Sequence, residues 1–225
     1  MPVTFYALRL CIFRRDLSFP PAALILPVSG MVWIWWLIPA LLVATGGLML
    51  VERSGVRTTL FLPFKGDVKR ETRFLAQWGQ FVCTALAAML VLQLDPSRGN
   101  KGRIVPTIVA VLLASGASNF IKRLVGRVRP GRTDAGKFLG VSWKHANYRE
   151  SFPSSHTACA AALSAGLAWM YPQAAATFWV LAAICGLLRY LMDAHWPSDV
   201  LGGFALGYGC AGLSWWFFVV MHPNW

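Results

Sequence analysis

Charged residues are scarce in this chain. Only 13% of its 225 residues are Asp, Glu, Lys or Arg, and 56% are hydrophobic, whereas a soluble domain averages about 25% charged residues. The apolar residues gather in runs of about 20, long enough to cross a roughly 30 Å hydrocarbon core. A soluble globular protein is therefore excluded, and the sequence predicts a membrane protein that crosses the bilayer several times.

Several motifs are also missing. The five cysteines are scattered without a CxxC or Cys/His spacing, and no Gly-rich nucleotide loop is present, so the common metal and nucleotide sites have no signal here. The net charge of +12 comes from cations in the short connections between apolar runs, where Lys and Arg commonly fix topology. We therefore expect no metal, no cofactor and no nucleic-acid partner.

The apolar runs predict an all-α fold, a bundle of six transmembrane helices preceded by a short N-terminal interfacial segment. That segment, residues 1–30, has apolar side chains around Arg9 and is interrupted by Pro20 and Pro21, which suits a helix lying on the membrane surface. Its start lacks the pattern of a cleavable signal peptide. The membrane domain, residues 31–225, holds predicted spans at 31–51, 74–94, 104–121, 154–170, 174–191 and 200–220.

Three polar clusters interrupt this pattern, and the first holds Lys122 and Arg129. The two residues are seven apart, close to two helical turns, so both side chains could point to one side. Pro130 disfavours a helical conformation at Arg129. A point-like ammonium beside a planar guanidinium suits a tetrahedral oxyanion such as phosphate, although cations next to a membrane also arise from topology alone.

The second cluster is Pro153-Ser154-Ser155-His156. Pro153 is well placed to start a helix, so we expect the N–H groups of Ser154, Ser155 and His156 to point out of its N-terminus and form an anion site. His156 could then donate a proton to a leaving-group oxygen. The alternative is that the serines cap the helix and His156 is merely interfacial.

The third cluster holds Arg189, His195 and Asp199. If the chain is helical from His195 to Asp199, the four-residue spacing puts imidazole and carboxylate on one face. A carboxylate bonded to one ring nitrogen makes the other a better base or nucleophile; the alternative is an interfacial pair without chemistry. Six spans place all three clusters on the same side of the membrane. Together they suit phosphoryl transfer through a phosphohistidine.

In sequence order, K-x6-R-P (Lys122 to Pro130), P-S-x-H (Pro153 to His156) and R-x5-H-x3-D (Arg189 to Asp199) resemble the signature of the phosphatidic acid phosphatase type 2 superfamily. Its members are integral-membrane lipid phosphate phosphatases, related in their site to vanadium haloperoxidases. Two departures stand out. Ser155 replaces a usual Gly, and Leu188 replaces a small residue, often Ser, before Arg189.

The resemblance implies a role for each site residue. His195 would be the nucleophile, Asp199 would orient it, and His156 would be the acid for the leaving group. The groups that would bind the substrate phosphate are Lys122, Arg129, Ser154, Arg189 and the backbone N–H of Ser155.

The sequence thus predicts a metal-independent membrane phosphatase that hydrolyses a phosphomonoester or diphosphate of an amphiphilic lipid. Candidate substrates are phosphatidate, phosphatidylglycerol phosphate, undecaprenyl diphosphate and the phosphates of lipid A, with loop 131–150 expected to lie over the site and help set specificity. Two alternatives stay open. A lipid phosphotransferase would share the phosphohistidine intermediate, and a lipid-binding or transport protein would need no catalysis.

Two signals disagree about which side of the membrane carries the site. The connections 52–73 and 122–149 hold fourteen Lys or Arg residues, against six in the N-terminal segment and the loop 98–103. Cytoplasmic loops are usually the richer in Lys and Arg, which favours a cytoplasmic site. The family resemblance implies instead the outer, periplasmic face of the inner membrane, and this is the placement we expect.

Overall fold

The computed structural model describes residues 22–56, 58–96 and 98–221. Within these ranges no strand forms, and β pairing is confined to two isolated bridges, Phe61 with Met192 and Arg127 with Phe138. The predicted all-α class is confirmed. The described α-helices are α2 (Ala22–Arg53), α3 (Gly66–Leu75), α4 (Phe81–Leu94), α5 (Arg98–Val125), α6 (Ser155–Met170), α7 (Ala175–Leu191) and α8 (Pro197–Trp215). Short 3-10 turns η1 (Asn147–Arg149) and η2 (Pro172–Ala174) and a π-helical end η3 (Trp216–Met221) complete them.

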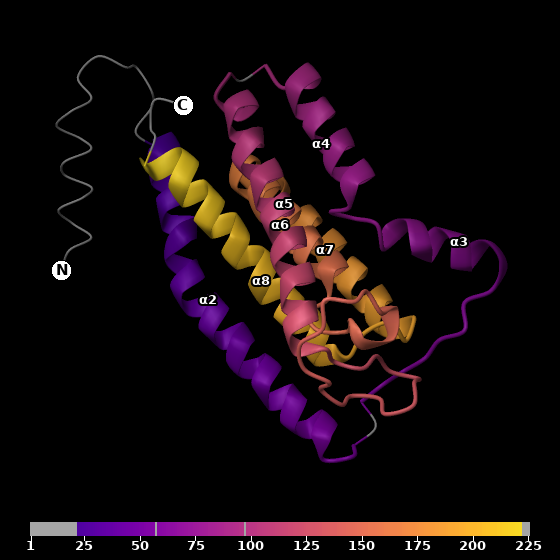
Figure 1. Ribbon diagram of the computed structural model, residues 1–225. Helices are drawn as coiled ribbons and strands as arrows, with labels where there is room; N and C mark the ends of the chain where they lie inside the picture. The colour runs from indigo at the N-terminus through magenta and orange to yellow at the C-terminus, as the bar shows by residue number, and fades with distance from the viewer. Residues whose placement is uncertain (1–21, 57, 97, 222–225) are drawn as a thin grey trace.

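Helix α6 lies at the centre of the bundle. It packs against α5, α7 and α8, while α2 runs along the outside of α8 (Figure 1). Helices α3 and α4 lie at the periphery, where α3 contacts α7 and α4 contacts α5. The central position of α6 follows from its sequence, because alanines such as Ala158 and Ala162 let neighbouring backbones approach closely and are fully buried.

Close approach between α6 and α8 depends on two glycines of α8. A Cβ atom at Gly203 would lie 2.7 Å from the carbonyl oxygen of Ser154, and one at Gly207 would collide with the carbonyl of Ala158. The Gly203–Gly207 pair therefore packs against α6, as its GxxxG spacing predicts. Since Ser154 immediately precedes α6, this contact also fixes where α6 begins.

A single methyl group at Gly203 is expected to destabilise the protein. In Gly203→Ala the new Cβ meets backbone rather than a movable side chain, and such overpacking typically costs about 1–3 kcal/mol. The matched control is Gly209→Ala on the same helix, where the nearest atom is Ile38 Cδ1 at 3.6 Å. Thermal unfolding in detergent should show a lower Tm for Gly203→Ala only; equal Tm values would contradict the packing argument.

In the part of the chain that the structure describes, three helical segments are long and apolar enough to cross a membrane by length and composition: Trp36–Arg53, Gly102–Val125 and Pro172–Leu191. The count of six spans therefore stays a prediction, although each predicted span overlaps a described helix. One predicted span is wrong as a continuous helix, because 74–94 is broken between α3 and α4. The predicted span 31–51 lies within the longer helix α2. The predicted interfacial segment falls mainly on residues 1–21, outside the described residues.

The break in span 74–94 has a physical cause. Gly79 has a φ of +80°, a conformation that glycine adopts without strain, and Trp78 beside it donates a hydrogen bond from Nε1 to Ser164 Oγ on α6 (2.9 Å). Helix α4 has 14 residues and is therefore about 21 Å long, short of a roughly 30 Å core.

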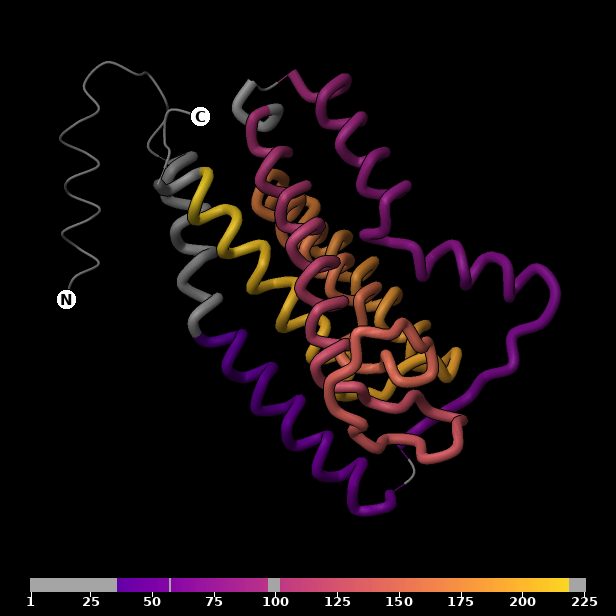
Figure 2. The backbone as a smooth tube through the Cα atoms, viewed as in Figure 1, coloured from indigo at the N-terminus to yellow at the C-terminus, as the bar shows by residue number. Residues whose placement is uncertain are grey.

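Four helix ends meet at one end of the bundle. The C-terminal ends of α5 and α7 and the N-terminal ends of α6 and α8 come together there, and the segment between α5 and α6 folds over them (Figure 2). Each of the three polar clusters lies at one or two of these ends. The fold thus brings together segments that are far apart in the sequence.

Candidate active site

His195 has a defined tautomer. Its side chain is 1% exposed, and Nδ1 lies 2.8 Å from the backbone carbonyl oxygen of Ser151. A carbonyl oxygen can only accept, so Nδ1 must carry the proton and donate it. Burial lowers the pKa of His195 to about 4, which keeps the ring neutral at pH 7 and leaves a lone pair on Nε2.

Asp199 contacts the imidazole less directly than the sequence predicts. Its Oδ2 lies 3.7 Å from His195 Nδ1, too far for a hydrogen bond. The expected helical spacing is absent, because α8 begins at Pro197, after His195. Oδ2 accepts hydrogen bonds from Ser151 Oγ (2.5 Å) and from the backbone N–H of Trp196 (2.9 Å). Asp199 therefore holds Ser151, whose carbonyl holds the ring.

Lys122 and Arg129 reach the site by a different geometry from the one predicted. Lys122 is in the last turn of α5, and its buried Nζ donates to Ser155 Oγ (2.5 Å). Gly126, with a φ of +61°, ends α5 in the left-handed conformation common after helix C-termini. Arg129 therefore lies in a loop rather than two helical turns beyond Lys122. Its Nη2 donates to the carbonyl oxygen of Glu150 (3.4 Å).

The second cluster forms a helix N-terminus, as predicted, but its first N–H group is already used. Ser154 is the N-cap of α6, and its N–H donates to the backbone carbonyl of Asp199 (3.0 Å). Its Oγ accepts a hydrogen bond from Thr157 Oγ1 (2.9 Å). The expectation of a free N–H at Ser154 is therefore wrong. Ser155 and His156 lie in the first turn, where N–H groups have no partner within the helix.

Three buried guanidinium nitrogens at this end of the bundle lack partners. Among the described residues, Nε of Arg127, of Arg129 and of Arg189 is buried without a hydrogen bond. The Arg127 guanidinium is already held by Glu52 and Asp199 through its Nη atoms, which leaves Arg129 and Arg189 to interact with a ligand. A buried donor that stays unpaired is unfavourable, and both suit an anion with several oxygens. The two arginines lie close enough to His156 and His195 to act on the charge of each ring. The arrangement can therefore bind an oxyanion beside two histidines.

Sequence reasoning missed three residues that support this cluster: Glu52, Arg127 and Ser151. Arg127 is 1% exposed and donates to Asp199 Oδ1 and to Glu52 Oε2, both at 2.6 Å. Arg127 lies inside the first motif, but nothing in its spacing marks it as different from its neighbours. Among the described residues, no group of three or more His, Cys, Asp or Glu side chains is arranged to hold a metal ion.

The loop 131–150 folds back along the segment 123–129. Backbone hydrogen bonds join Val128 N to Lys137 O (2.9 Å) and Leu139 N to Gly126 O (3.0 Å). Beside it lies a cavity of about 510 Å³. This cavity is lined by Glu52, Arg53, Arg127, Ala135, Gly136, Lys137, Phe138, Leu139 and Trp196.

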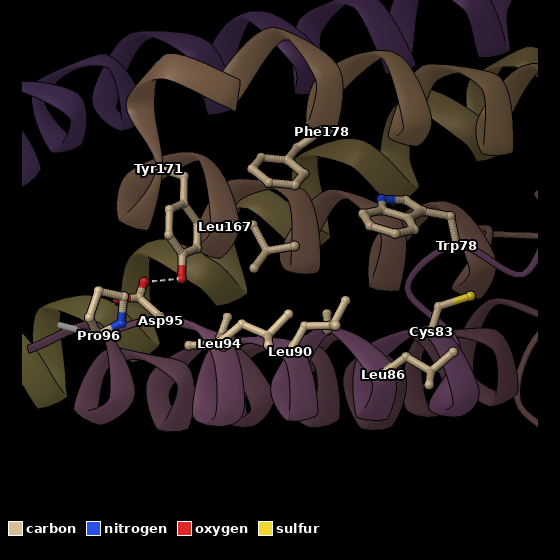
Figure 3. A pocket seen from close by; sticks show the side chains of 12 residues that line it. Trp78, Cys83, Leu86, Leu90, Leu94, Asp95, Pro96, Leu167, Tyr171 and Phe178 are labelled. Carbon is tan, nitrogen blue, oxygen red and sulfur yellow. Dashed lines mark hydrogen bonds between the residues drawn. The ribbon is translucent and has the colours of Figure 1, made fainter. Parts of the chain in front are cut away.

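A second cavity, of about 590 Å³, is apolar and lies apart from these groups. Figure 3 shows its lining side chains, which come from α4, from α6 and α7 and from the segments beside them, with Tyr171 donating a hydrogen bond to Asp95. It contains none of the predicted site residues. The polar chemistry is therefore concentrated at the end of the bundle that carries His195.

Comparison with known proteins finds a family that matches just over half of this chain. The model of the PAP2 superfamily matches residues 103–221. A lipid A 1-phosphatase of Rhizobium johnstonii is 36% identical over 91 residues, covering 40% of this chain and 37% of that protein. A lipid A 1-phosphatase of Rhizobium etli is 38% identical over 92 residues, covering 40% and 39%. The chain thus aligns with less than half the length of these relatives.

One solved structure has a similar fold. The crystal structure of LpxE from Aquifex aeolicus superposes with a TM-score of 0.54 at 20% sequence identity, covering 68% of this chain and 87% of that chain. At this identity the likeness concerns the fold. It is consistent with the helical arrangement around α6 that gathers the polar clusters at one end.

Proposed function

The chain belongs to the PAP2 superfamily, and from this premise we propose that it is a membrane lipid phosphatase that works through a phosphohistidine. The observation that carries the proposal is the hydrogen bond from His195 Nδ1 to Ser151 O. It leaves Nε2 unprotonated, as a nucleophile must be. Arg129 and Arg189, with unpaired buried donors, supply the charge that a phosphoryl group requires.

In the proposed first step, Nε2 of His195 attacks phosphorus and the bond from phosphorus to the leaving oxygen breaks. His156, which would be protonated when the anionic phosphate is bound beside it, donates a proton to that departing oxygen, which leaves as an alcohol or, from a diphosphate, as a phosphate. Water then attacks the phosphohistidine, His156 accepts a proton from it, and inorganic phosphate and free His195 result. No other reactant is needed.

The remaining predicted residues would bind the phosphoryl oxygens. Lys122, Arg129 and Arg189 would stabilise the equatorial charge, and the N–H of Ser155 would donate from the start of α6. Ser155 Oγ already accepts from Lys122 Nζ, so the side chain that replaces the family's usual glycine helps to hold Lys122. Ser154 would contribute as the N-cap that positions this turn.

The substrate would be a phosphorylated amphiphilic lipid. The names of the two Rhizobium relatives favour the 1-phosphate of lipid A as the first to test, with loop 131–150 helping to set the preference. In this proposal the chain crosses the inner membrane six times and the site opens on the periplasmic face. Exposed Trp143 and Tyr148 of the loop suit a membrane interface.

A substrate panel tests this function. Purified protein in detergent should release inorganic phosphate from lipid A, phosphatidate, phosphatidylglycerol phosphate or undecaprenyl diphosphate, and EDTA should not change the rate. With labelled substrate, the label should appear in inorganic phosphate; transfer to a second lipid would identify a phosphotransferase instead. Absence of phosphate release from the whole panel, in protein that shows a cooperative thermal transition, would count against the proposal.

A further inference from the structure

We infer that Glu52 is a positioning residue of this site and acts through Arg127 on the segment that carries His195. The inference rests on the phosphatase function proposed above and extends it to α2. The family match covers residues 103–221, so Glu52 lies outside it. It adds to the active site a helix that carries none of the three motifs.

Glu52 is buried although it stands next to the last residue of α2. Its side chain is 2% exposed and accepts three hydrogen bonds. Oε1 accepts from the backbone N–H of Ser198 (3.0 Å), and Oε2 accepts from Ser198 Oγ (2.5 Å) and from Arg127 Nη2 (2.6 Å). Ser198 is in the first turn of α8, so this carboxylate holds one of the N–H groups that a helix start leaves unpaired.

Arg127 joins Glu52 to both sides of His195. Through its side chain, Nη1 donates to Asp199 Oδ1 and to Ser198 Oγ, each at 2.6 Å. Through its backbone, the Arg127 carbonyl accepts from the N–H of Ser151 (3.0 Å). Ser151 is the residue whose carbonyl holds Nδ1 of His195. A shift of Arg127 would therefore move the partner of the nucleophile's ring from two directions.

The charges of this network also depend on Glu52. Arg127 places one positive charge between two buried carboxylates, Glu52 and Asp199, and its guanidinium also lies over the rings of Phe138 and Trp196 at 5.4 and 5.2 Å. A buried charge is tolerated when it is paired and hydrogen-bonded. Without the carboxylate of Glu52, Nη2 loses its partner and Arg127 is bound on one side only.

The amount of burial and the number of bonds exceed what an incidental ion pair at a helix end would show. Exposed pairs such as Arg70 with Asp67, whose side chains are 74% and 86% exposed, contribute little. The Glu52 contacts instead connect α2, the first motif and the start of α8. They fix the position of a ring that must attack along a defined line, where a displacement of about 1 Å can cost about 100-fold in rate.

The test is Glu52→Gln, which keeps the shape and removes the charge. We expect kcat to fall about 10- to 100-fold while KM changes less than about threefold, because Glu52 does not reach the phosphate-binding groups. Glu71→Gln, an acidic residue 64% exposed on α3, is the matched control and should keep the wild-type kcat. If Glu52 acts through Arg127, the double variant with Arg127→Gln should lose no more than Arg127→Gln alone.

A wild-type kcat in Glu52→Gln would overturn the inference, and so would losses of kcat that multiply in the double variant. Should Glu52→Gln fail to fold, Ser198→Ala removes one hydrogen bond to Glu52 while the charges of Glu52 and Arg127 remain, and it should lower kcat by about 3- to 10-fold. An unchanged kcat in this variant would also overturn the inference.

The ¹⁵N chemical shifts of the His195 ring give a readout that does not need turnover. Loss of the single Nδ1–H tautomer in Glu52→Gln supports the inference, and its retention opposes it. Absence of phosphate release by the wild type would instead reject the proposed function.

Discussion

Replacing His195 by alanine is expected to lower phosphate release by about 10⁴-fold or more. The reason is that the lone pair on Nε2 is the nucleophile of the proposed first step, and alanine supplies nothing to form the covalent intermediate. In the structure this lone pair is fixed by the donation of Nδ1 to Ser151 O at 2.8 Å. The measurement is the initial rate of phosphate release by purified protein under saturating lipid substrate.

Two controls separate lost chemistry from lost fold. His195→Gln retains polarity and much of the volume of the buried ring, and it should be as inactive as His195→Ala. Inorganic phosphate should still raise the Tm of both variants, because Arg129 and Arg189 are unchanged and ligand binding to the folded state stabilises it. A variant that binds phosphate and turns over within tenfold of the wild type would rule out His195 as the nucleophile.

The sequence predicts the position of the polar clusters well where the signal is local. Lys122, His156, Arg189 and His195 each follow or precede an apolar run, where an ionisable residue needs a reason, and the fold brings the helix ends beside them together. The placement of all three clusters at one end also followed from counting spans. What these residues share is that their position along a helix is enough to locate them.

The predictions failed where a backbone group replaced a side chain as the partner. The sequence expectation paired His195 with Asp199, yet Nδ1 donates to the carbonyl of Ser151, a group every residue carries. The N–H of Ser154 was likewise expected to be free, but it donates to the carbonyl of Asp199. Side-chain identity does not reveal such partners, because they depend on how closely α6 approaches α8 at Gly203.

Helix ends were the other source of error. The predicted two-turn spacing of Lys122 and Arg129 failed because Gly126 ends α5 between them. Glu52 falls in the connection 52–73 that the sequence predicts between the first two spans, and no motif there marks it as different from its neighbours. Its burial depends on Arg127 and Ser198, which are 75 and 146 residues away along the chain, and no local pattern encodes that distance.

The second large effect is expected for His156→Ala, and its size should depend on the leaving group. If His156 donates a proton to the departing oxygen, its removal should slow cleavage of a lipid phosphomonoester by about 10²- to 10⁴-fold. In an aryl phosphate whose phenol is acidic, the phenolate leaves without needing a proton. Cleavage of such a substrate by His156→Ala should therefore slow by less than about tenfold. Comparing kcat/KM for the two substrates in the variant and in the wild type gives the result.

Lys122→Met provides the contrast that makes this prediction specific. The Nζ of Lys122, bonded to Ser155 Oγ at 2.5 Å, would face the phosphoryl oxygens and not the leaving oxygen, so its loss should slow both substrates by a similar factor. For a lipid diphosphate, the loss of kcat/KM in His156→Ala should lie between the losses for the lipid phosphomonoester and for the aryl phosphate. The reason is that its leaving phosphate is more acidic than an alcohol. An equal loss for every leaving group in His156→Ala would show that His156 binds phosphate and donates no proton, and the acid would then have to be sought elsewhere in the site.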